Sequence, residues 1–175
     1  DYTNALSRFT SAEVIARATE PARLNKYFYF EQGSTYERKG DLDQAEQCFE
    51  KSLALEPDFP EALNYLGYML AERGIKLSHA HELIEKAVKL QPKSAAYVDS
   101  LGWVLYKLDR PQEALAQIQK AIALSEEVDP TLYDHLGDIY AALKEPGKAR
   151  DAWRKSLAVE PNDQIRKKLD QAAGK

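Results

Sequence analysis

The sequence has little cysteine and no excess of basic residues. Its 175 residues include a single cysteine, Cys48, so the chain cannot form an internal disulfide or supply a set of thiolates for a zinc ion. It carries 24 basic and 28 acidic residues, a formal net charge of −4, which argues against non-specific binding of nucleic acid or of an anionic membrane surface. We therefore expect no nucleic-acid partner, and the cysteine content does not indicate a cellular compartment.

The sequence also lacks long hydrophobic runs. No apolar stretch approaches the roughly 18 residues that cross a bilayer, and no basic, apolar and small-residue series indicates a signal peptide. We expect no direct membrane insertion of this segment. Because the chain begins at Asp1 rather than methionine, we interpret it as a piece of a longer protein whose targeting segment, if present, lies outside this sequence.

Half of the eight glycines recur at a regular interval. They lie 34, 35 and 35 residues apart, and each stands in a stretch with apolar residues at helical spacing: Gly33, Gly67, Gly102 and Gly137. A glycine inside a helix costs about 1 kcal/mol relative to alanine, so this regularity calls for a packing reason. Alanines and then prolines follow in the same order: Ala45, Ala80, Ala114 and Ala149, then Pro57, Pro92 and Pro161. This order indicates one pair of helices per unit of about 34 residues.

The residues around these landmarks resemble the tetratricopeptide repeat family. The match is closest in the fourth unit, which has Tyr133, Leu136, Gly137, Tyr140, Ala149, Trp153 and Pro161. The first unit departs from the family pattern at Gln32, where the family has leucine, and the second and third units carry aliphatic replacements for aromatics. The resemblance implies an all-α fold, a right-handed superhelical solenoid of antiparallel helix pairs.

The period divides the chain into six segments. Residues 1–25 are expected to be the remnant of an upstream helix pair, and residues 162–175 a C-terminal capping helix and tail. Four repeats are predicted between them, at about 26–59, 60–94, 95–129 and 130–161. Glycines are expected to end the first helices of two repeats, and prolines to begin the second helices of two others: Gly40 and Gly74, then Pro111 and Pro146.

Both ends of the chain carry local helix signals. Thr10 and Glu13 form a possible capping box for a helix through about Ala18. Four apolar residues there are expected to be available for burial: Leu6, Phe9, Val14 and Ile15. At the other end Asn162 is expected to cap a short helix. Two of its residues should face inward and three outward: Ile165 and Leu169, then Arg166, Lys167 and Lys168.

No constellation of residues predicts catalysis, and we expect no cofactor or metal site. His79 and His81 lie on nearly opposite sides of a helix, and the second histidine of the zinc-protease motif is missing. His135 stands beside the expected core face, and no basic neighbour obviously activates Cys48. We interpret all four residues as structural.

The resemblance implies that the first helices line a concave groove. Helical geometry places a row of aromatic, carboxylate and amide side chains there: Phe30, Asn64, Tyr68, Asp99, Trp103, Tyr106, Asp134 and Asp138. Large aromatics are common binding anchors, and the carboxylates favour a protein or peptide partner with Lys, Arg or backbone N–H donors. The alternative is that Trp103 and Tyr68 pack between adjacent first helices and that the carboxylates form a solvated face.

A narrower resemblance concerns the subgroup. Chaperone-binding members of the family have a lysine three residues before the glycine, where this chain has Phe30, Asn64, Asp99 and Asp134, so we expect no such role. The blocks beginning at Asn64, Tyr97 and Asp134 look like the C-terminal repeats of large bacterial tetratricopeptide proteins. Many of those are exported or are outer-membrane lipoproteins, and serve as adaptors for envelope enzymes such as carboxyl-terminal processing proteases.

These resemblances favour a non-enzymatic adaptor that binds a partner in the groove. Two alternatives stay open: a spacer or self-association scaffold, and the recognition arm of an enzyme whose catalytic domain lies outside the sequence. The resemblance favours the bacterial periplasm or outer membrane, and it does not exclude the cytoplasm.

Overall fold

The computed structural model describes residues 1–127 and 129–173, and within these ranges the chain is helical with no strand. The elements are α1 (Tyr2–Thr19), the 3-10 helix η1 (Pro21–Arg23), α2 (Lys26–Lys39), α3 (Leu42–Leu55), α4 (Pro60–Arg73), α5 (Leu77–Leu90), α6 (Ala95–Lys107), α7 (Pro111–Leu124), α8 (Pro130–Ala142), α9 (Pro146–Val159) and α10 (Asp163–Ala173). The expected all-α solenoid is confirmed. Among the described residues, no helix is both long and apolar enough to cross a membrane.

The helix boundaries follow from local chemistry. Gly40 and Gly74 end α2 and α4 with φ angles of 86° and 67°, in the left-handed region where a side chain would be strained. Pro111 and Pro146 occupy the first positions of α7 and α9, where the missing N–H leaves no hydrogen bond unmade. These four predictions are confirmed. The connection between α7 and α8 contains Val128, which lies outside the described residues.

Each helix pair closes around one glycine and one large side chain. A Cβ on Gly67 would lie 2.5 Å from Cγ1 of Ile84 and 3.0 Å from the carbonyl oxygen of Ala80. The other three pairs repeat this contact, with Gly33 against Phe49, Gly102 against Ile118 and Gly137 against Trp153. The alanines of the period, Ala45, Ala80, Ala114 and Ala149, are all fully buried between the helices. The glycines therefore set the distance between the paired helices.

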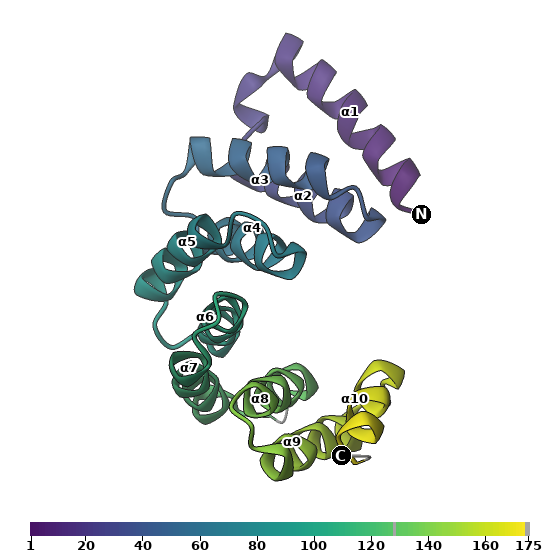
Figure 1. The fold of residues 1–175 in the computed structure, drawn as a ribbon. Coiled ribbons are helices and arrows are strands. Elements are labelled where there is room, and N and C mark those ends of the chain that lie inside the picture. Colours follow the sequence, from purple (N-terminus) through teal and green to yellow (C-terminus); the bar gives the residue numbers. More distant parts are fainter. Residues whose placement is uncertain (128, 174–175) are drawn as a thin grey trace.

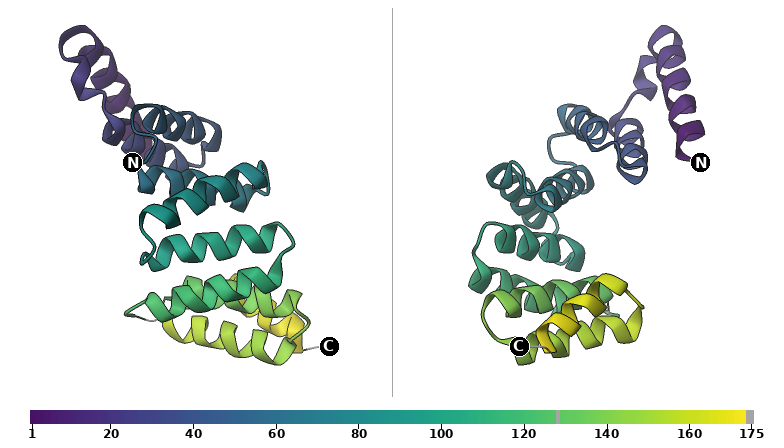
Figure 2. Two further views of the ribbon diagram at one scale, coloured as in Figure 1. Left: turned by 90° about the vertical axis from the view of Figure 1, so that its left-hand side faces the viewer. Right: turned by 45° about the vertical axis from the view of Figure 1, so that its right-hand side comes forward.

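The helix pairs stack into a curved, two-layered array. Figure 1 shows the first helices α2, α4, α6 and α8 along the inner side of the curve and the second helices α3, α5, α7 and α9 along the outer side. The hydrophobic core runs lengthwise through successive pairs, from Phe49 in α3 to Ala152 in α9. Figure 2 shows α1 at one end of the stack and α10 folded against the other.

The N-terminal helix ends at Thr19, close to the predicted end near Ala18, but it starts earlier than predicted. It begins at Tyr2, where the Asp1 carboxylate accepts hydrogen bonds from the backbone N–H groups of Thr3 and Asn4. Thr10 lies inside this helix and donates its hydroxyl to the carbonyl oxygen of Leu6, so the predicted capping box is wrong. A β-region residue is needed at a helix N-cap, and the helical pattern that begins upstream of Thr10 prevents that conformation.

Burial of the α1 side chains was predicted correctly only in part. Leu6 is buried and Phe9 packs edge-to-face on Phe28 of α2, with ring centroids 5.4 Å apart. Val14 and Ile15, by contrast, are 66% and 61% exposed. They lie on the side of α1 that faces away from α2, where no described helix covers them.

The C-terminal helix is capped as predicted but directs one side chain differently. Asn162 accepts hydrogen bonds from the N–H groups of Gln164 and Ile165, and Ile165 is buried. Arg166 and Lys167 are exposed, as expected. The outward prediction for Lys168 is wrong, because its ammonium group bonds to two carboxylates of α8.

The glycine contacts generate a stability prediction. Gly137→Ala should lower the free energy of unfolding by about 1–3 kcal/mol, because the rigid indole of Trp153 fills the space that the new methyl group needs. Gly147→Ala is the matched control: no atom lies within 4 Å of a Cβ there, so it should raise stability by about 0.4–1 kcal/mol. Urea unfolding followed by circular dichroism measures both, and equal effects would contradict the packing role of Gly137.

Candidate functional site

The inner faces of α4, α6 and α8 form two adjoining clefts. The first has a volume of about 450 Å³ and lies between α4, α6 and the start of α8. The second, also about 450 Å³, continues from it toward α10. Tyr68 and Thr131 line both clefts and thus mark the boundary between them. We call the two clefts together the inner groove.

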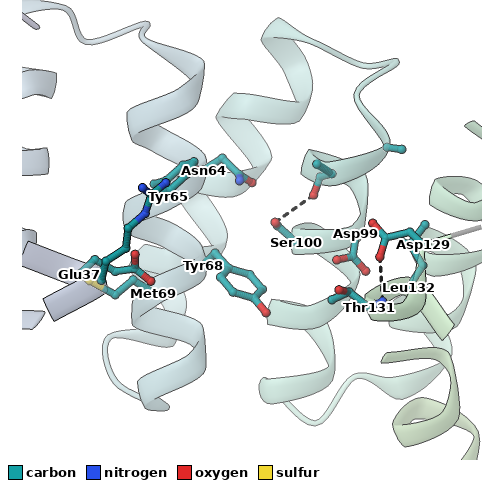
Figure 3. A pocket seen from close by; sticks show the side chains of 13 residues that line it. Glu37, Asn64, Tyr65, Tyr68, Met69, Asp99, Ser100, Asp129, Thr131 and Leu132 are labelled. Atoms are coloured by element: carbon teal, nitrogen blue, oxygen red, sulfur yellow. Dashed lines mark hydrogen bonds between the residues drawn. The ribbon is translucent and has the colours of Figure 1, made fainter. Parts of the chain in front are cut away.

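Asn64 and Tyr68 project from α4 across the first cleft. Figure 3 shows both side chains pointing from α4 toward α6, where Asp99 and Ser100 form the facing wall. Asn64 is only 9% exposed, yet its Oδ1 atom has no hydrogen-bond donor among the described residues. A buried acceptor without a donor costs about 1–3 kcal/mol. Asn64 therefore lines the first cleft and carries one buried acceptor that no described donor satisfies.

Asp99 belongs to a packed network beneath the groove surface. Its Oδ1 lies 2.9 Å from Nδ1 of His135, and both residues are buried. Because a carboxylate only accepts, Nδ1 of His135 donates this bond. Within the described part of the chain, the second oxygen, Oδ2, has no hydrogen bond. Asp99 is thus oriented by α8 and retains a free acceptor at the first cleft.

Trp103 packs against the same buried network, beneath the groove surface. Its ring stacks on His135 at a centroid distance of 4.0 Å and on Tyr106 at 5.0 Å. The indole Nε1–H donates to Glu72 of α4, and the residue is only 7% exposed. The position of Trp103 therefore matches the alternative in which it packs between adjacent first helices. Tyr106 is half-buried beside it.

Tyr68 keeps its hydroxyl proton in these surroundings. Burial, and then the negative charges of Glu72, Asp99 and Asp134, raise the pKa of Tyr68 above its ordinary value. Burial and the charge of Asp138 act in the same direction on the pKa of Tyr106. Tyr68 therefore offers the groove a neutral donor on an aromatic ring, set among carboxylates.

The second cleft holds a carboxylate pair that is already bound. Nζ of Lys168 in α10 donates to Asp134 at 2.8 Å and to Asp138 at 2.7 Å. The other oxygen of Asp138 accepts from the indole N–H of Trp153 at 3.1 Å. Burial raises the pKa of Asp138, although Lys168 and Trp153 oppose the shift. Burial lowers the pKa of Lys168, but its bonds to Asp134 and Asp138 outweigh it and raise that pKa overall.

The eight residues of the predicted row do not form one surface. Asn64, Tyr68 and Asp99 meet in the first cleft, while Asp134 and Asp138 line the second with Trp103. Phe30 lies apart from both clefts, in an aromatic cluster with Phe49, Phe59 and Tyr65. Sequence reasoning missed His135 and Lys168 as members of the groove. Lys168 follows Asp134 by 34 residues, so the repeat period could have placed it there.

The described residues supply no evident reactive group. Burial raises the pKa of the Cys48 thiol to about 11, against a smaller opposing effect of Lys51, so the thiol stays protonated near neutral pH. Within residues 1–127 and 129–173, no three His, Cys, Asp or Glu side chains are arranged to hold a metal ion. The inner groove combines acceptors, an aromatic donor and negative charge.

Comparisons with known proteins agree with this architecture. The chain is 37% identical over 102 residues to a TPR repeat-containing protein, PA4667, of Pseudomonas aeruginosa, a match that covers 58% of this chain and 17% of that relative. The solved structure of the Cut9–Hcn1 hetero-tetramer of APC/C is similar over 98% of this chain and 33% of that chain, with a TM-score of 0.80 and 25% identity. YrrB, described as a TPR protein with an unusual peptide-binding site, is similar over 97% of this chain and 84% of its own, with a TM-score of 0.70 and 19% identity.

Family models for the tetratricopeptide repeat match residues 30–95, 94–128 and 130–163, which together cover most of the chain. The glycine contacts and the stacked helix pairs are the structural counterpart of these matches. This chain belongs to the tetratricopeptide repeat family.

Proposed function

We propose that this chain is a non-enzymatic interaction module, an adaptor that binds an extended segment of a partner protein in the inner groove. The observation that carries the proposal is Asn64, whose Oδ1 is buried without a donor at the edge of an open cleft. A peptide bond brings an N–H donor and a carbonyl acceptor together, so an extended backbone satisfies both ends of the Asn64 amide. The free protein bears the cost of an unpaired acceptor, and the complex relieves it.

The charges of the groove favour a segment with Lys or Arg. Glu37, Asp99 and Asp129 all line the first cleft, and among its described lining residues Arg38 alone is a cation. The second cleft shows how the groove accommodates an ammonium group, since Lys168 sits between two carboxylates there. Tyr68, between the clefts, provides an aromatic face for a cation or for the aliphatic stem of its side chain.

Membership of the family supports a role in protein interactions, without specifying the binding site. Tetratricopeptide arrays generally serve as scaffolds for protein interactions, and the fold offers an extended concave surface for this purpose. YrrB, which shares the fold, is described as having a peptide-binding site. The chain spans 17% of the length of its Pseudomonas relative.

A binding selection tests the proposal. Peptides of 12 residues selected from a random phage library on the immobilised chain should be enriched in Lys and Arg. In calorimetric titrations the Asn64→Ala and Asp99→Asn variants should bind such a peptide at least about tenfold more weakly than the wild type. Each variant removes one buried hydrogen bond to the peptide, from the Asn64 amide or to the Asp99 carboxylate. Gln112→Ala and Asp151→Asn, both on exposed positions of the outer layer, are the matched controls. Equal losses in all four variants, or none, would refute the groove assignment.

A self-association scaffold is the second candidate, and the exposed apolar face of α1 favours it. Val14 and Ile15 lie side by side in sequence and are mostly exposed. If this face pairs with a second copy, the mass measured by light scattering should rise above 19.8 kDa with concentration and return to that value in the Ile15→Glu variant. A constant mass in the wild type eliminates this candidate and leaves the groove proposal unaffected.

A further inference from the structure

Lys168 is held at the end of the inner groove by the chain itself. It projects from α10, and its ammonium group fills the space between Asp134 and Asp138 of α8. The separation of 34 residues from Asp134 places Lys168 in the same row as Asn64, Asp99 and Asp134, one repeat period further on. The row of acceptors therefore ends in a lysine ammonium group, the type of cation that the groove is proposed to bind in a partner.

The contacts that hold α10 are few. Its buried anchor is Ile165, and Leu169 and Ala172 pack only partly against α9. Arg150 of α9 donates to the backbone carbonyl of Ala172 at 3.1 Å. The helix is joined to α9 by three exposed residues, Glu160, Pro161 and Asn162. Among its described side chains α10 buries one apolar residue, whereas α8 buries three, Leu132, Leu136 and Ile139, so local opening of α10 is expected to cost less.

Open space lies on both sides of the Lys168 side chain. On one side it lines the second cleft, beside Tyr68 and Trp103. On the other it lines a further cleft of about 520 Å³ between α10, α9 and the end of α8, beside Ala141 and Trp153. The ammonium group is thus neither sealed in the core nor free in solvent, and its side chain is 31% exposed. Both clefts therefore adjoin the Lys168 side chain, and a competing cation can approach it from them.

We propose that Lys168 is an internal ligand of the inner groove, and that a Lys or Arg side chain of the bound segment displaces it from Asp134 and Asp138. This inference rests on the proposed function and adds its regulation. The exchange replaces one cation by another, so the two neighbouring carboxylates are never left unpaired. Because Lys168 competes from within the same chain, it lowers the apparent affinity of the groove for basic segments and favours partners that also fill the first cleft.

The test uses a defined probe, a fluorescein-labelled nonapeptide of alternating Lys and Ser, in anisotropy titrations with the full chain. Lys168→Met should bind it about fivefold more tightly than the wild type, since the internal competitor is gone. Lys167→Met changes the net charge equally on the exposed side of the same helix and should stay within about twofold of the wild type. Equal affinities of the two variants would overturn the inference.

A second measurement on the wild type does not depend on how well α10 folds in a variant. The side-chain NMR signals of Lys168 should move, at saturation with the peptide, to the positions that the exposed Lys167 shows. Unchanged Lys168 signals at saturation would overturn the inference. If Asn64→Ala loses binding but the two lysine variants bind equally, the proposal that Lys168 is an internal ligand is refuted and the groove proposal stands. If neither the wild type nor any variant binds the peptide, both proposals are refuted.

Discussion

The contact between a glycine of each first helix and a large side chain of the following second helix determines the geometry of the whole array. With Gly67 against Ile84 and Gly102 against Ile118, the two helices of a pair approach so closely that a methyl group no longer fits. Equal spacing in successive pairs lets them stack in one direction, and the stack curves. The inner groove exists because this curvature aligns α4, α6 and α8 on one side.

Much of the fold could be predicted because the packing residues recur with the period of the structure. Gly40, Gly74 and the helix-starting prolines act through their own backbone, so their local sequence suffices. The prediction failed where a local signal competed with a longer pattern. Thr10 is a good cap in isolation, but the helical sequence around it extends α1 back to Tyr2, with Asp1 as the cap. The exposure of Val14 and Ile15 depends on which helices pack against α1, which the local sequence does not encode.

The groove could be predicted only as a row of positions. Helical geometry gives the side of the helix from which Trp103 and Asp99 project, but not which neighbour covers them. In the structure the indole of Trp103 stacks on His135, and the Asp99 carboxylate bonds to the same ring. Trp103 is therefore buried beneath the groove, whereas Asp99 keeps a free acceptor at its surface. Lys168 was not predicted as a groove residue, because the exposed residues beside it in the sequence indicated a solvated face. Its bonding partners lie in another helix.

The central claim is that the inner face of α4, α6 and α8 binds a segment of a partner. Backbone amide NMR shifts measured on the full chain during titration with a phage-selected peptide test it most directly. Binding in the inner groove should produce shifts that cluster around Asn64, Tyr68 and Asp99, with smaller shifts on the outer helices. Shifts that cluster on the outer faces of α3, α5, α7 and α9, or on α1, would contradict it.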